Sequence, residues 1–222
     1  MIKDVLTELE NKSNKSVIKR YEKNNEPKPY YGVLKGEINK IAKKLKINNK
    51  LAKQLWETKN LDAMLLAVQL FDSQKLNIND IDFLVNKNIS LTVLDSFTEK
   101  VIFNSLCWKD IMNNFSTMDS IIYNRLSWKL RVKYFASKQA TNEEIELILK
   151  EIKENLVSSP DLVKWVMNHC LVTIAINYDN YLEYCISLGE ELSVYKDQKV
   201  SKGCTSAYAP DWIAALLNRK NK

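Results

Sequence analysis

The sequence contains few of the residues that interrupt regular structure: four glycines and four prolines among 222 residues. A sheet-rich protein with many tight turns, or a doubly wound nucleotide-binding fold, needs more glycine than this. No P-loop, G-x-G-x-x-G or G-x-S-x-G motif occurs. Nucleotide hydrolysis and serine hydrolysis therefore have no support in the sequence.

Histidine is also scarce, because His169 is the one histidine of the chain. The four cysteines, Cys107, Cys170, Cys185 and Cys204, form no C-x-x-C pair. His169 and Cys170 are adjacent and would point about 100° apart on a helix, which suits tetrahedral metal ligation poorly. We expect no metal site and no cofactor, and we interpret the cysteines as small buried apolar residues.

Long apolar runs are absent as well. No run approaches the roughly 18 residues that span a bilayer, and the N-terminal stretch MIKDVLTELENKSNK is charged throughout. A signal peptide would need an apolar core there. We expect a cytoplasmic protein that does not bind membranes.

The apolar residues that are present recur at helical spacing, most clearly in residues 36–47, 61–72 and 142–156. Short polar stretches separate such segments, and we expect breaks at residues 25–32, 46–50, 77–82, 136–144 and 157–162. In the last of these, Ser159 is expected to cap a helix that begins at Pro160. The pattern predicts an all-α protein, with antiparallel helix pairs stacked as an α-solenoid in units of roughly 35–45 residues.

We predict one solenoid domain over residues 1–222. It would comprise an N-terminal helical pair (1–26), a repeat body (30–203) and a C-terminal capping piece (204–222). Within the last piece we expect a short helix from Tyr208 to Leu217 that docks Trp212 on the last repeat.

Positive charge is unevenly distributed. Residues 1–60 carry 15 Lys+Arg against 7 Asp+Glu, whereas the rest of the chain carries 18 against 20. A concentrated basic field favours an anionic partner, most often nucleic acid. A lysine-rich composition from an AT-rich genome would give the same excess and remains the alternative.

The run from Ser120 to Asn142 contains no acidic residue. If Ser127 caps a helix there, one face would carry Trp128, Arg131 and Phe135. Carboxylates near a phosphate backbone would repel it, so we interpret the run as a DNA-facing helix whose aromatic residues pack in the core. Its basic residues are Arg125, Lys129, Arg131, Lys133 and Lys138, with Lys129 and Lys133 one turn apart.

Four stretches, in this order and spacing, resemble a known family: KRYEKN with YYGVLKGEINKIAKKL, LWETKNLDAMLLAVQLFD, VLDSFTEKVI and SWKLRVKYF. They are similar to the DNA alkylation repair family, the AlkD-like glycosylases of HEAT-like repeats. A C-terminal piece, Val163–Gly189 followed by GCTSAYAPDWI, resembles one branch of the same family.

The resemblance implies a monomeric HEAT-like solenoid whose concave, cationic face holds duplex DNA without sequence specificity. In active members an aromatic pair and a carboxylate face the sugar of a damaged nucleotide during base excision repair. The bond hydrolysed is the N-glycosidic bond of an N3- or N7-alkylated purine, and the carboxylate stabilises the cationic sugar.

Alignment to the family places Leu94 at the first aromatic position and Thr98 at the catalytic aspartate. A threonine carries no charge, so activity is weak or lost unless Glu99 or Asp95 substitutes for it. The other residues expected to contact DNA are Arg131 at the family's DNA-facing arginine, Lys129, Lys133, Arg125, Lys164, Trp128, and Asn168 or His169 at the second aromatic position. A non-catalytic scaffold that binds a protein partner on the same face is the alternative function.

Overall fold

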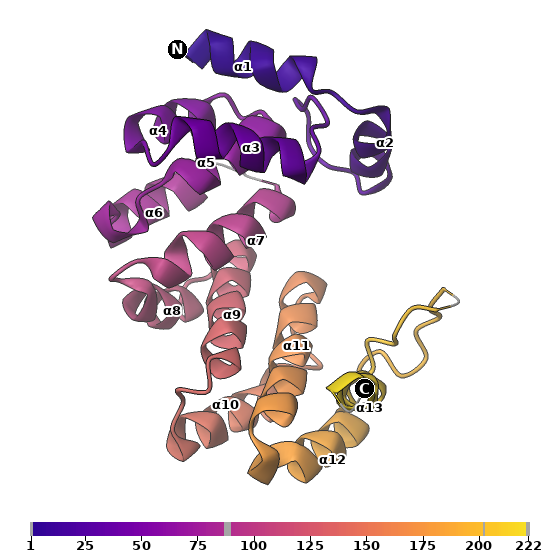
Figure 1. Cartoon of the computed structure of the whole chain (residues 1–222). Helices are drawn as coiled ribbons and strands as arrows, with labels where there is room; N and C mark the ends of the chain where they lie inside the picture. The colour runs from indigo at the N-terminus through magenta and orange to yellow at the C-terminus, as the bar shows by residue number, and fades with distance from the viewer. Residues whose placement is uncertain (1, 87–89, 202, 221–222) are drawn as a thin grey trace. The chain divides into compact units, whose positions relative to one another are not determined.

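The computed structural model describes residues 2–86, 90–201 and 203–220, in which every regular element is a helix (Figure 1). The all-α prediction is confirmed for these residues. The backbone forms two compact units, Met1–Ile111 (unit 1) and Met112–Lys222 (unit 2). The sole β feature of the described residues is an isolated bridge between Ser13 and Val33.

The helices of unit 1 follow one another with short connections. They are α1 (Ile2–Asn11), α2 (Lys15–Lys23), α3 (Lys35–Leu45), α4 (Asn49–Glu57), α5 (Leu61–Leu70), η1 (Ser73–Lys75), α6 (Ile78–Val85), α7 (Leu91–Lys100) and η2 (Ile102–Asn104). Helix α8 (Trp108–Ser116) contains the boundary between the units.

Unit 2 contains the longer helices. They are α9 (Ile121–Ala136), α10 (Asn142–Asn155), α11 (Asp161–Asn177), η3 (Asp179–Tyr181), α12 (Leu182–Leu192) and α13 (Ala209–Lys220). The predicted C-terminal helix therefore exists, and it begins one residue later than expected.

Asparagine starts many of these helices. The side chains of Asn14, Asn48 and Asn60 accept hydrogen bonds from backbone N–H groups of the first turns of α2, α4 and α5. Asn77 does the same for α6 and forms a capping box with Asp80. The break predicted at residues 77–82 is therefore wrong, because this polar stretch is a capping signal followed by a helix.

Two predicted caps are also wrong. Ser127 lies inside α9, and its hydroxyl donates to the Met112 carbonyl at 2.6 Å. Ser159 donates to the Asn155 carbonyl at 2.9 Å, and α11 begins after Pro160. Ser159 bonds to the carbonyl four residues before it, which is the local alternative that a serine hydroxyl offers to capping, whereas Ser127 bonds to a carbonyl of α8.

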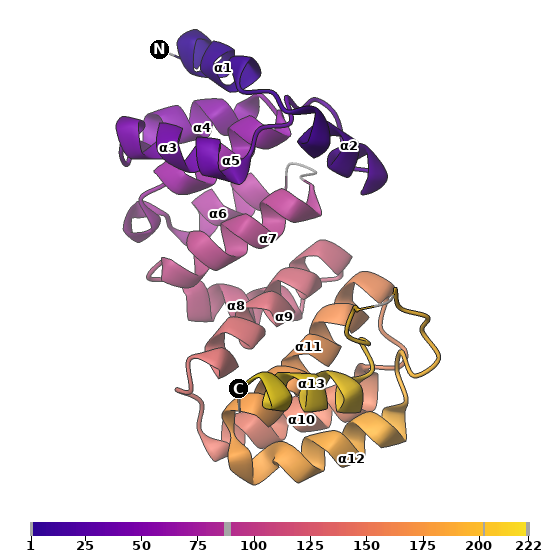
Figure 2. The same cartoon turned by 45° about the vertical axis from the view of Figure 1, so that its right-hand side comes forward.

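The core of unit 1 surrounds α5, which lies against α3, α4 and α7 (Figures 1 and 2). Nearly all of α5 is buried, so its apolar residues lie on every side rather than in one stripe. The rings of Trp56, Phe71 and Phe97 pack with centroids 4.8–5.8 Å apart.

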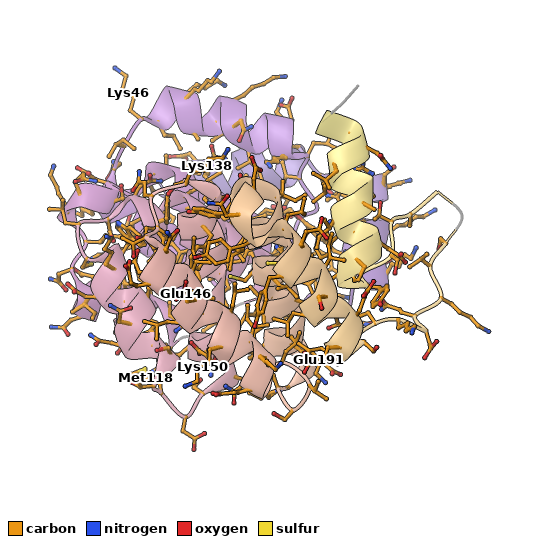
Figure 3. All side chains as sticks on the ribbon, turned by 90° about the horizontal axis from the view of Figure 1, so that it is seen from below. Lys46, Met118, Lys138, Glu146, Lys150 and Glu191 are labelled. Atoms are coloured by element: carbon orange, nitrogen blue, oxygen red, sulfur yellow. The ribbon has the colours of Figure 1, made fainter. Side chains whose placement is uncertain are left out.

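The core of unit 2 is built on α9 and α11, and α11 also packs against α10, α12 and α13 (Figure 2). The buried residues Trp128, Phe135 and Met167 belong to this core. Charged residues of α10 and α12, such as Glu146, Lys150 and Glu191, lie exposed on the outside (Figure 3). None of the helices in the described part of the chain combines the length and apolar character of a membrane span.

Candidate functional site

A buried aspartate shapes the connection between α2 and α3. The Asp62 side chain is fully buried at the start of α5. Its carboxylate accepts the backbone N–H groups of Tyr31, Gly32 and Val33 at 2.7–3.0 Å and the Tyr21 hydroxyl at 3.0 Å. Burial, with Asp62 next in effect, raises the pKa of Tyr21 far above its usual value, so this hydroxyl stays a donor.

Gly32 is required in this connection. Its backbone has φ +79°, and a Cβ there would lie 2.4 Å from Cγ1 of Ile18. The connection therefore runs directly against α2, and the Asp62 hydrogen bonds hold it there.

Glu26 joins the same connection to the start of α7. Its carboxylate accepts the Ser90 hydroxyl at 2.5 Å and also the Thr92 hydroxyl. Ser90 caps α7 by accepting the N–H of Thr92. These contacts hold the start of α7 against the connection between α2 and α3.

A cavity of about 450 Å³ opens between α2, α3, α5 and α7 in unit 1. Three cationic side chains from three helices line it: Arg20, Lys35 and Lys100. The carboxylates of Asp95 and Glu99, one turn apart on α7, line it too. The cavity therefore brings together both residues that the sequence suggested as substitutes for the catalytic aspartate.

The cations influence each other. Partial burial lowers the pKa of Lys100, the charge of Lys35 lowers it further, and Glu99 opposes both effects. Two ammonium groups held close enough to repel one another would gain from an anionic group placed between them.

Thr98 does not reach this cavity. Its side chain is fully buried, and its hydroxyl donates to the Leu94 carbonyl at 2.8 Å. Leu94 is 1% exposed. The two positions that alignment assigns to an aromatic residue and an aspartate thus face the core, whereas Asp95 and Glu99, each one residue further along the helix, face the cavity.

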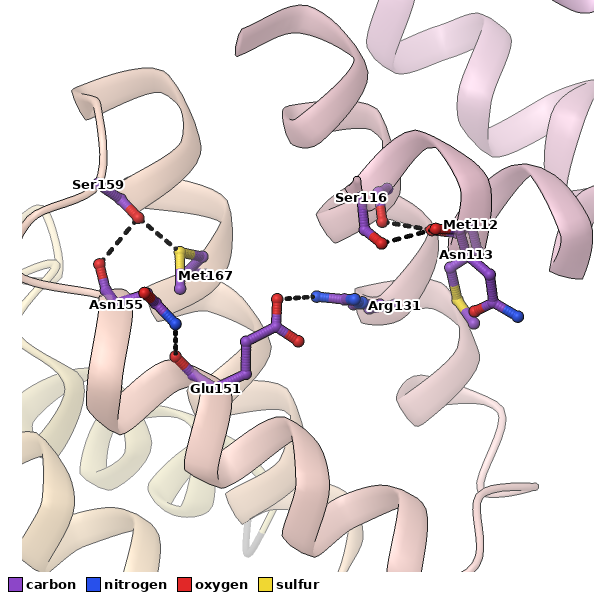
Figure 4. Close-up of polar contacts among 9 residues, drawn as sticks. Met112, Asn113, Ser116, Arg131, Glu151, Asn155, Ser159 and Met167 are labelled. Carbon is purple, nitrogen blue, oxygen red and sulfur yellow. Dashed lines mark hydrogen bonds and ion pairs between the residues drawn. The ribbon is translucent and has the colours of Figure 1, made fainter. Parts of the chain in front are cut away.

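Helix α9 places Arg131 in the core of unit 2. Its side chain is 9% exposed, its guanidinium lies 4.3 Å from the Trp128 ring centroid, and Nη1 is 2.9 Å from a carboxylate oxygen of Glu151 (Figure 4). The predicted phosphate contact of Arg131 stays a prediction, since a phosphate would have to share this guanidinium with Glu151 or displace it.

Arg125 is similarly engaged with the protein. It is 7% exposed, and its Nη1 donates to the Leu162 carbonyl at 2.7 Å. The run thus forms a largely buried helix of unit 2, in which Arg125 and Arg131 both make contacts within the protein.

The lysines predicted to contact DNA are more accessible. Lys129 and Lys133 on α9 are half-buried. Lys164 on α11 is half-buried, with Nζ 3.8 Å from the Asp161 carboxylate. These side chains are more accessible to solvent than Trp128, Arg125 and Arg131, which are at most 8% exposed.

Asn168 and His169 hold the C-terminal segment on α11. Asn168 is 1% exposed and donates to the Ala207 carbonyl at 2.7 Å. The His169 ring stacks on Trp212 of α13 with centroids 5.0 Å apart and planes at 15°. Trp212 therefore docks on α11 as predicted, and the partly exposed Trp165 also contacts both rings.

Sequence reasoning missed Arg20, Lys35 and Lys100 as site residues. The signal for Arg20 was present, because it lies in the KRYEKN stretch that carries the family resemblance. No local pattern brings Lys35 and Lys100 together, because they are separated by 65 positions and meet through the packing of α3 and α7 around the cavity.

Within the described residues, no group of three or more His, Cys, Asp or Glu side chains could hold a metal ion. Burial raises the pKa of Cys185 to about 12, and burial also raises that of Cys170. Both thiols therefore stay protonated in the core of unit 2.

Comparison with known proteins gives one family and one fold. The sequence model that describes the DNA alkylation repair enzyme family matches residues 2–191 of this chain. A solved structure described as "a new family of proteins related to the HEAT-like repeat DNA glycosylases with affinity for branched DNA structures" has a TM-score of 0.86 to this chain at 25% sequence identity. The match covers 99% of this chain and 94% of that chain, which confirms the predicted HEAT-like helical fold. Among proteins of curated function, none is significantly similar in sequence.

Proposed function

The chain belongs to the DNA alkylation repair enzyme family, and from this premise we propose that it binds duplex DNA without sequence specificity. The observation that carries the proposal is the convergence of Arg20, Lys35 and Lys100 from three helices around one cavity. Arginine and lysine contact phosphate oxygens whatever the base sequence. The likeness to a protein with affinity for branched DNA supports branched duplexes as the preferred form.

Base excision is the second candidate function, favoured by the side chains of Asp95 and Glu99 in the same cavity. An alkylated purine is already a cationic leaving group, so the protein needs a carboxylate close to the developing positive charge on the sugar. Position 98 lies in the core, so Glu99 takes the role of that carboxylate in this proposal. Asp95 lies one turn earlier on α7 and is half-buried, and its negative charge adds to that of Glu99.

The test of binding is fluorescence anisotropy with a labelled duplex and a labelled four-way junction, across a range of salt concentrations. We expect affinity to fall steeply with salt for both, and the junction to be bound more tightly. The triple variant Arg20→Gln, Lys35→Gln, Lys100→Gln should weaken binding at least about tenfold, because charged contacts are lost. A matched control replaces three exposed lysines of unit 2, Lys138, Lys150 and Lys196, by glutamine.

Salt-insensitive or absent DNA binding would instead support the protein–protein scaffold.

The test of chemistry is release of N7- or N3-methylpurine from methylated duplex. If base excision operates, Glu99→Gln should reduce release by at least about a hundredfold, as expected for loss of one preorganised charge. Release that persists in Glu99→Gln and Asp95→Asn would show that neither carboxylate is catalytic.

A further inference from the structure

Two neighbouring parts of unit 2 are strongly acidic, although the whole chain has a net charge of +6. Residues 142–155 form α10, and residues 179–192 form η3 and α12. Together they carry nine acidic residues against two lysines. Helices α10 and α12 pack against each other (Figures 1 and 2). Because like charges repel, this part of unit 2 disfavours contact with a phosphate backbone and suits a cationic partner.

A groove of about 410 Å³ lies between these elements. Its lining residues are Glu146, Leu149 and Lys150 of α10, Asn180 and Tyr181 of η3, and Tyr184 of α12. Two contacts tie its walls together. The Tyr181 hydroxyl lies 3.3 Å from a carboxylate oxygen of Glu146, and Nζ of Lys153 lies 2.9 Å from the Glu191 carboxylate. The groove is therefore formed before any partner arrives.

The groove combines an accessible aromatic ring with an apolar base. The Tyr184 side chain is 48% exposed, whereas Leu149 is 2% exposed and belongs to the core of unit 2. Tyr181 is partly buried and packs against the same core. A tyrosine ring that stays in contact with solvent can stack on a planar group or hold a cation over its face.

Carboxylates set the sign of the charge at the groove. Desolvation raises the pKa of the Tyr181 hydroxyl, and the charges of Glu146 and Glu143 raise it further, so both carboxylates lie near this ring. Lys150 is the one cation among the lining residues, and the carboxylate of Glu154, exposed on the same helix, lies 3.9 Å from it. An ionised carboxylate has about four acceptor sites, of which the bond from Tyr181 uses one on Glu146.

We propose that this groove docks an arginine side chain from a basic segment of a partner protein, with the guanidinium at Tyr184 and Glu146. A guanidinium is planar and cationic, so it stacks on an aromatic ring and donates two parallel hydrogen bonds to one carboxylate. Its aliphatic stem can lie along the apolar side of the groove. The inference is independent of the proposed DNA binding, because it uses none of the residues assigned to DNA contact.

The first experiment is fluorescence anisotropy of the full chain with a labelled peptide of alternating glycine and arginine. The comparison peptides carry lysine or the neutral isostere citrulline in place of arginine. We expect the arginine peptide to bind about threefold or more tightly than the lysine peptide, because an ammonium lacks the planar stacked geometry. The citrulline peptide should bind at least about tenfold more weakly, because it lacks the charge. Absent binding of the arginine peptide, or equal binding of the citrulline peptide, overturns the proposal.

Variants locate the bound peptide. Tyr184→Ala and Glu146→Gln should each weaken the arginine peptide about threefold to fivefold, the size expected for one exposed cation–π or charged contact. Tyr184→Phe keeps the ring and should retain the affinity. The controls lie in unit 1: Phe83→Ala removes an aromatic ring that is 59% exposed on α6, and Glu22→Gln removes an exposed carboxylate of α2. Peptide affinity that is unchanged in Tyr184→Ala and Glu146→Gln, or lowered equally by the controls, overturns the proposal.

The second experiment tests two other occupants of the groove. Sedimentation velocity measures self-association of the wild type and of Tyr184→Ala, and anisotropy with a labelled single-stranded oligothymidine measures binding of nucleic acid to both. A dimer that Tyr184→Ala dissociates would assign the groove to a second copy of the chain and overturn the proposal. Oligonucleotide affinity that falls in Tyr184→Ala would assign it to nucleic acid and overturn the proposal as well. Unchanged association state and oligonucleotide affinity, together with weakened peptide binding, support it.

Discussion

At the scale of single residues, Arg131 has a different environment from the one its sequence position suggests. The resemblance assigns it to DNA, yet the side chain stacks on the buried Trp128 and pairs with the partly exposed Glu151 of unit 2. A planar guanidinium can make both contacts at once, whereas a lysine ammonium cannot reproduce the stacked geometry.

We therefore predict that Arg131→Lys lowers the free energy of unfolding by about 1–2 kcal/mol, through loss of the cation–π contact and of the fixed ion-pair geometry. Urea unfolding followed by far-UV circular dichroism measures the change. The control is the opposite exchange at an exposed site of α10, Lys150→Arg (Figure 3). Unchanged stability together with lost DNA affinity would establish Arg131 as a phosphate contact.

Asp62 is the second residue whose role depends on burial. Its two oxygens satisfy three backbone N–H groups of the connection between α2 and α3 and the Tyr21 hydroxyl of α2, and Tyr21 and Val33 line the cavity. Asp62→Asn would turn an amide NH₂ toward at least one of these donors. We predict a loss of about 3 kcal/mol in the free energy of unfolding, because buried donors lose their charged acceptor.

The same urea unfolding measurement tests Asp62→Asn, with Asp197→Asn as its control. Asp197 is exposed in the connection before α13. A change of less than about 0.5 kcal/mol in Asp62→Asn, the usual range for surface substitutions, would contradict the anchoring role.

At the scale of secondary-structure elements, ion pairs of Glu37 join α3 to the turn after α1. Glu37 lies 2.6 Å from Lys40 on its own helix and 2.9 Å from Lys12. Hydrogen bonds from Lys40 and then from Lys12 lower the pKa of Glu37 to about 2 from its usual 4.5. The folded state therefore binds the proton of this carboxyl more weakly than the unfolded state does.

The contribution of Glu37 to stability should be fully present above pH 4.5 and should be lost as the pH falls from 4.5 toward 2. Glu37→Gln should melt at a lower temperature than the wild type at pH 7, and the difference should vanish near pH 2. Thermal melts at a series of pH values measure it. Glu154→Gln serves as the control, and a difference for Glu37→Gln that is constant with pH would contradict the ion-pair account.

The helix α7 shows what an amphipathic pattern can and cannot assign. Its spacing identifies a helix, and Val93, Leu94 and Phe97 form its buried side. Alignment to a family motif then assigned the catalytic position to Thr98, which lies on that buried side. A shift of one residue rotates a helical position by about 100°, enough to exchange the core for the cavity.

At the scale of the whole molecule, the two units differ in charge. Residues 1–111 carry 19 Lys+Arg against 14 Asp+Glu, a net +5, whereas residues 112–222 carry 14 against 13, a net +1. Helix α2 presents Lys15, Lys19 and Lys23 at four-residue spacing, all exposed. Arg20, from the same helix, lines the cavity.

We predict that replacing Lys15, Lys19 and Lys23 by glutamine lowers the slope of log affinity against log salt by up to about 3, since each phosphate contact contributes about 0.9. The triple glutamine variant of Lys138, Lys150 and Lys196 removes the same charge from unit 2 and should change the slope less. Anisotropy titrations at several salt concentrations measure both slopes. Equal effects would mean that net charge alone, and not the surface of unit 1, governs binding.

The sequence by itself determined the helical class, because apolar spacing and asparagine caps act over a few residues. It also carried the family resemblance in the order of four short stretches. Only the tertiary structure decided which charged residues reach solvent together. The surroundings of Arg131, a carboxylate or a phosphate, depend on how helices distant in the chain pack around it. The same packing decides whether Thr98 or Glu99 faces the cavity, because neighbouring residues of a helix point to different sides.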